Sequence, residues 1–133
     1  MFPKLDLVTA SYHRCRERDD FIDTFYNQFL ATSREVADKF RGTDFKRQKL
    51  MLRESLLSML LYNLGYEDAQ EELEQLAERH SRREVDIAPN LYDLWLDSLV
   101  ETISICDLEY TEELGQLWRA AMQPGIDLLI SKY

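Results

Sequence analysis

LEQLAERH, at residues 73–80, is the segment from which the rest of this chain can be interpreted. Leu73, Leu76 and His80 are spaced three and four residues apart, so in a helix all three lie on one face. Acidic residues precede this segment at Glu67 and Asp68 and basic residues follow it, which matches the dipole of a helix. A lone histidine on an apolar face is usually an ordinary core residue, but neutral imidazole is also a common metal ligand. Both interpretations of His80 stay open on local sequence alone.

The wider sequence predicts an all-α protein with a single domain over residues 1–133. Gly and Pro account for only seven of the 133 residues, about 5%, against roughly 12% in an average protein. The apolar content of 45% is enough for one hydrophobic core. Apolar residues at helical spacing predict helices at residues 5–18, 21–30, 36–40, 44–64 and 67–83, another after Pro89, and a last one from Thr111. The first of these has an apolar stripe of Leu5, Val8, Tyr12 and Cys15.

Charge and targeting signals restrict the classes of partner. The chain has 16 basic and 25 acidic residues and a net charge of -9, which argues against nucleic acid and against an anionic membrane surface as partners. The N-terminal residues lack the pattern of a signal peptide, and no apolar run approaches the ~18 residues that span a bilayer. We therefore expect a soluble cytoplasmic protein. Cys15 and Cys106 are expected to be reduced thiols, with a disulfide between them as the alternative.

Several short motifs follow one another in a characteristic order. Leu76-Ala77-Glu78-Arg79-His80 is followed by a corner with Ile87 and Pro89 and then by Tyr92, while Phe25-Tyr26 precedes Glu35-Val36 and Phe40. Trp118, Ala121 and Met122 lie in the last predicted helix, which begins at Thr111. In this order and spacing, residues 5–132 resemble the globin family, specifically the bacterial single-domain globins. The resemblance implies a globin-like three-on-three helical sandwich.

The resemblance also implies a cofactor and its ligand. His80 falls on the proximal histidine that binds the iron of haem b (iron protoporphyrin IX), and its second ring nitrogen is expected to donate to a nearby carbonyl or hydroxyl. Tyr26 falls on a tyrosine of the distal pocket that can donate a hydrogen bond to O2, with an ordinary core role as the alternative. Phe40 falls on the phenylalanine that packs against the haem face. The other residues expected to contact haem are Lys49, Leu52, Arg53, Leu56, Leu76, Ile87, Tyr92 and Leu96.

The distal helix, at residues 44–64, can be oriented in two ways. Placing its most apolar face inward turns Lys49, Leu52, Arg53, Leu56 and Leu60 toward the haem, with Leu52 at the position that guards the ligand. A shifted register brings Gln48 to that position instead and puts Leu52 one turn deeper. In the first register Lys49 and Arg53 either pair with the haem propionates or remain surface cations, and Lys49 is also a conceivable sixth iron ligand.

The resemblance implies reversible binding of O2, as in oxygen transport or storage, or of NO or CO. One alternative is a globin-fold sensory or interaction domain without haem, in which His80 is a core residue. Another is a haem NO dioxygenase or peroxidase served by a separate reductase. Flavohaemoglobins have a glutamate in the last helix that strengthens electron donation by the proximal histidine, whereas residues 130–133 read ISKY. An enzyme is therefore the less favoured interpretation, and we assign no catalytic residue. A monomer and a homodimer are both compatible with the sequence.

Overall fold

The computed structural model describes the backbone of residues 3–133 and the side chains of residues 7–133. Met1, Phe2 and the side chain of Leu5, which the sequence placed on the first apolar stripe, lie outside the described residues. Over residues 3–133 the chain forms helices and no strand. The seven helices are α1 (Pro3–Arg16), α2 (Phe21–Leu30), α3 (Arg34–Lys39), α4 (Phe45–Asn63), α5 (Glu67–His80), α6 (Asn90–Cys106) and α7 (Glu112–Ser131).

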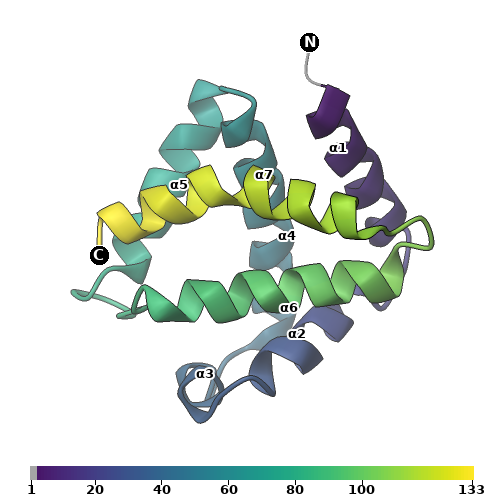
Figure 1. The fold of residues 1–133 in the computed structure, drawn as a ribbon. Coiled ribbons are helices and arrows are strands. Elements are labelled where there is room, and N and C mark those ends of the chain that lie inside the picture. Colours follow the sequence, from purple (N-terminus) through teal and green to yellow (C-terminus); the bar gives the residue numbers. More distant parts are fainter. Residues whose placement is uncertain (1–2) are drawn as a thin grey trace.

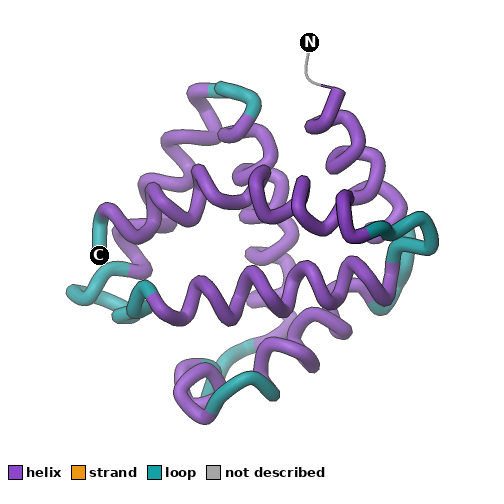
Figure 2. Tube along the Cα trace, viewed as in Figure 1, coloured by secondary structure: helices purple, strands orange, loops and turns teal. Residues whose placement is uncertain are grey.

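The helices begin and end largely where local sequence signals place them. The Thr111 hydroxyl accepts a hydrogen bond from the N–H of Leu114 at 3.1 Å and caps α7, as expected of a threonine at this position. Gly65 follows α4 with φ +93°, a conformation that favours glycine. The helix predicted over residues 67–83 is three residues too long, since α5 ends at His80. Residues 81–89 then form the longest connection, visible as the extended teal segment between α5 and α6 in Figure 2.

The helices pack around one apolar core. In Figure 1, α6 and α7 run nearly antiparallel across the front, with α2 below them and α4 behind. α2 packs on α6, while α4 contacts both α5 and α7. Gly125 allows the last of these contacts, because a Cβ at this position would lie 3.0 Å from Cε of Met59. One continuous apolar cluster joins all seven described helices, and the short helix α3 contributes Val36 to it.

A buried polar network fastens α1 to the turn between α6 and α7. The carboxylate of Asp107 is fully buried and accepts hydrogen bonds from Ser11 Oγ at 2.6 Å and from Arg14 Nε and Nη2 at 2.6 and 2.9 Å. Trp118 Nε1 donates to Ser11 Oγ at 3.0 Å. Since the bonded residues are 93 to 107 positions apart in the chain, the network fixes tertiary packing.

The two cysteines are both buried and unbonded, which agrees with the expectation of reduced thiols. Burial is the main reason that the pKa of the Cys15 thiol is raised to about 12, so this thiol stays protonated at neutral pH. No helix in the described part of the chain is long and apolar enough to cross a membrane.

Candidate functional site

A cavity of about 280 Å³ lies between α4 on one side and α5 with α6 on the other. This volume is close to the lower end of the range for small-molecule pockets, about 300–1,000 Å³. Its walls are mostly apolar and aromatic. The aromatic members of the lining are Phe25, Tyr26, Phe29, Phe40, Tyr92 and Trp95, and the aliphatic and sulfur-containing members are Val36, Met51, Leu52, Met59, Leu76, Val85, Ile87, Leu91, Ile126 and Leu129.

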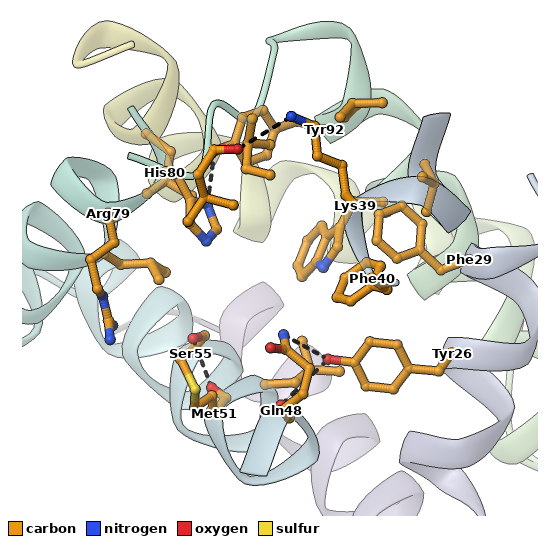
Figure 3. A pocket seen from close by; sticks show the side chains of 18 of the residues that line it. Tyr26, Phe29, Lys39, Phe40, Gln48, Met51, Ser55, Arg79, His80 and Tyr92 are labelled. Carbon is orange, nitrogen blue, oxygen red and sulfur yellow. Dashed lines mark hydrogen bonds between the residues drawn. The ribbon is translucent and has the colours of Figure 1, made fainter. Parts of the chain in front are cut away.

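His80 reaches into this cavity from the last residue of α5. Its imidazole faces the cavity from the wall opposite Tyr26 and Gln48 (Figure 3). Burial, with a smaller contribution from the nearby charge of Arg79, lowers the pKa of His80 to about 4, so the ring is neutral at pH 7. Nδ1 lies 3.1 Å from the hydroxyl oxygen of Tyr92. When Nδ1 donates to that oxygen, Nε2 carries the unshared electron pair that a metal ligand needs.

The opposite wall carries Tyr26 from α2 and Gln48 from α4. Nε2 of Gln48 donates to the hydroxyl oxygen of Tyr26 at 3.2 Å, and this hydroxyl donates to the backbone carbonyl of Gln48 at a long 3.4 Å. Burial raises the pKa of Tyr26 to about 12 despite the hydrogen bond from Gln48, which acts in the other direction. Tyr26 therefore keeps its proton and remains a donor at physiological pH.

Of the two orientations considered for α4, the structure has the one in which Gln48 faces the cavity. The lining residues of α4 are Gln48, Met51, Leu52, Ser55 and Met59, at helical spacing on one face. The orientation based on the most apolar face does not describe this helix, because its leucines Leu56 and Leu60 pack in the protein core rather than at the cavity. Of the five residues it turned inward, only Leu52 lines the cavity. Lys49 pairs with Asp23 at 2.6 Å, and Arg53 is exposed.

Of the remaining residues expected to contact a cofactor, four line the cavity and one does not. Phe40, Leu76, Ile87 and Tyr92 line the cavity together with His80. Leu96 is buried in the core and is not part of the lining, one turn beyond Tyr92 on α6. Its neighbour Trp95 takes the place at the cavity, with its ring 6.0 Å from that of Phe25. The step of three residues from Tyr92 to Trp95 was the available sequence signal for this tryptophan.

The positive charges at the cavity come from residues that the sequence did not single out as contacts. Lys39 and Arg79 line it, and no carboxylate does so among the described lining residues. Arg79 is exposed and Lys39 half-exposed, which marks the mouth of the cavity, where Nζ of Lys39 donates to the carbonyl of Val85 at 3.2 Å. In a chain with a net charge of -9, this is a local positive region. The residues present thus fit an apolar ring system with carboxylates at one edge and a metal that accepts an imidazole nitrogen, which describes haem.

Comparison with known proteins identifies the fold. No family model matches the sequence, and no curated protein does so either. A crystal structure from Pseudomonas aeruginosa PAO1, of a protein described as structurally highly homologous to a human hemoglobin, matches with a TM-score of 0.93. The two sequences are 38% identical, and the match covers 98% of each chain. The prediction of an all-α globin fold is confirmed. The chain therefore belongs to the globin family, among its bacterial globin-like members.

Proposed function

We propose that this protein is a haem-binding globin of a single cytoplasmic domain, in which His80 is the proximal ligand of the iron. The observation that carries the proposal is the neutral imidazole of His80 at an apolar cavity, opposite two polar donors. When bound, haem supplies an iron centre that binds O2, NO or CO reversibly. The likeness of the fold to a haemoglobin-like protein supports the same conclusion.

On the proximal side, Tyr92 orients the histidine. Its hydroxyl lies 3.1 Å from Nδ1 of His80, and burial raises the pKa of this hydroxyl well above its usual range. The hydroxyl therefore remains neutral, and its oxygen can accept a hydrogen bond from the N–H at Nδ1. In this arrangement the imidazole has the tautomer whose Nε2 is free to bind a metal.

On the distal side, Tyr26 and Gln48 supply hydrogen-bond donors to a small polar ligand. As a donor, the Tyr26 hydroxyl makes only a long contact to the Gln48 carbonyl, so its proton can turn toward such a ligand at little cost. Next to this position, the ring of Phe40 lies 5.7 Å from that of Tyr26, and Leu52 lines the cavity one turn of α4 after Gln48. They limit the access of water, which favours retention of a gas ligand.

Ligand binding is better supported than redox catalysis. α7 contributes only Ile126 and Leu129 to the cavity lining, and both are apolar. Among the described lining residues no carboxylate can increase the electron donation of His80. This arrangement favours the binding of O2 or another diatomic gas over peroxidase chemistry.

The test is a titration of the haem-free protein with hemin, followed by Soret absorption. We expect tight binding by the natural protein and at least about 100-fold weaker binding by His80→Ala, since loss of even a hydrogen-bond partner of a ligating histidine costs about 10–100-fold. His13→Ala is the matched control, because His13 is exposed on α1. A protein that takes up no hemin would instead be an interaction or sensory domain without haem. Consumption of NO over many turnovers with an added reductase would support the enzymatic alternative.

A further inference from the structure

The loop at residues 82–87 connects the histidine of α5 to the mouth of the cavity. The backbone N–H groups of residues 85–87 donate to the carbonyls of residues 79–81 at 2.9–3.1 Å, so the loop is folded back on the end of α5. Val85 and Ile87 from this loop line the cavity. Any displacement of the loop therefore changes both the opening of the cavity and the surroundings of His80.

The loop has one strained residue. Asp86 adopts φ +56°, and it is the one residue other than glycine with a positive φ in the described chain. Aspartate tolerates this left-handed conformation better than most residues do, but the conformation is still less favourable for aspartate than for glycine. Such a conformation persists only where neighbouring contacts hold it. The backbone N–H of Asp86 donates to the Ser81 carbonyl at 2.9 Å. The contact to its side chain comes from a distant part of the chain, where the hydroxyl of Tyr133 donates to Oδ1 at 2.5 Å.

Tyr133 also contacts the start of the loop. The guanidinium carbon of Arg82 lies 4.5 Å from the centre of the Tyr133 ring, a cation–π contact. The N–H of Arg82 points to the carbonyl of Tyr133 at a long 3.5 Å. On the other side of the loop, Lys39 of α3 donates to the carbonyl of Val85. Tyr133 thus contacts the loop at Arg82 and at Asp86, and Lys39 contacts it at Val85, between these two positions.

We propose that Tyr133 is a positioning residue, which holds Asp86 and so keeps the loop at residues 82–87 closed over the cavity mouth and His80 in place. The loop links the two effects, because its backbone is bonded directly to the carbonyls of residues 79–81. The part of the inference that treats His80 as a metal ligand rests on the proposed function. The part that concerns the loop does not.

The first test needs no haem. Tyr133→Phe removes only the hydroxyl, and hydrogen exchange of the amides of residues 85–87, followed by NMR, is expected to accelerate about two- to ten-fold. Tyr66→Phe is the matched control, because Tyr66 is exposed at the opposite end of α5. Asp86→Asn keeps an acceptor oxygen and tolerates the left-handed backbone, so it should exchange like the natural protein. Unchanged exchange in Tyr133→Phe would overturn the proposal.

The second test uses the haem-loaded protein. We expect Tyr133→Phe to release hemin to a scavenger protein about two- to ten-fold faster than Tyr66→Phe, with a shifted iron–histidine stretching band in the ferrous state. Faster exchange of the loop without either change would show that Tyr133 does not position His80. If the natural protein bound no hemin, both the proposed function and the role of His80 as an iron ligand would be refuted. The exchange rates would then still decide whether Tyr133 holds the loop.

Discussion

Replacement of Tyr26 by phenylalanine probes the distal side of the cavity with little effect on packing. The Tyr26 side chain is 4% exposed, and its ring makes edge contacts with Phe40 and Phe45 at 5.7 and 5.5 Å. Phenylalanine preserves these aromatic contacts. The substitution therefore removes one hydroxyl and the two hydrogen bonds that this hydroxyl makes with Gln48.

The structure sets the size of the expected effect. A hydrogen bond from Tyr26 to the partly negative outer atom of O2 is worth about 1.5–3 kcal/mol. The hydroxyl must first leave the Gln48 carbonyl, but at 3.4 Å that bond is long, and its loss costs only about 0.5 kcal/mol. The net stabilisation of roughly 1–2.5 kcal/mol corresponds to about 5- to 70-fold faster dissociation of O2 from Tyr26→Phe.

The assay is stopped-flow displacement of O2 by excess CO from the reduced, haem-loaded protein. CO dissociation provides an internal comparison, because CO accepts hydrogen bonds much more weakly than O2 and should change far less. Tyr12→Phe is the control for loss of a buried tyrosine, since Tyr12 is buried beside Trp118 and does not line the cavity. An O2 dissociation rate within twofold of the natural protein, or equal changes for O2 and CO, would refute the donor role of Tyr26.

Two further predictions concern the register of α4 and the buried network. Gln48→Leu should speed O2 dissociation, whereas Lys49→Met should leave it unchanged, because Lys49 pairs with Asp23 outside the cavity; equal rates in the two variants would contradict the observed register. Asp107→Ala should lower the free energy of unfolding, measured with urea, by about 2–4 kcal/mol, somewhat less than a fully buried pair because the Arg14 side chain is 31% exposed. Burial raises the pKa of Asp107, but hydrogen bonds, chiefly from Arg14, outweigh it and the pKa is lowered overall. The stabilisation by Asp107 is thus complete above about pH 4 and lost as the pH falls through the folded-state pKa, so the natural protein should lose more stability than the variant on acidification.

Much of the fold and the position of His80 at the cavity follow from local sequence. Caps and breakers act within one turn, so Thr111 and Gly65 set helix boundaries wherever the helices later pack. The three- and four-residue spacing of Leu73, Leu76 and His80 likewise places the histidine on the apolar face of α5. The structure finds Leu76 and His80 together in the cavity lining.

Tertiary structure alone decided what faces His80. Hydrophobicity could not orient α4, because its most apolar residues, Leu56 and Leu60, fill the core while the cavity receives the polar Gln48. Contacts between distant parts of the chain also could not be predicted from local sequence. Tyr133 and Asp86, for example, are 47 residues apart. A helical period determines which residues share a face, but only the packing of neighbouring helices determines what that face meets.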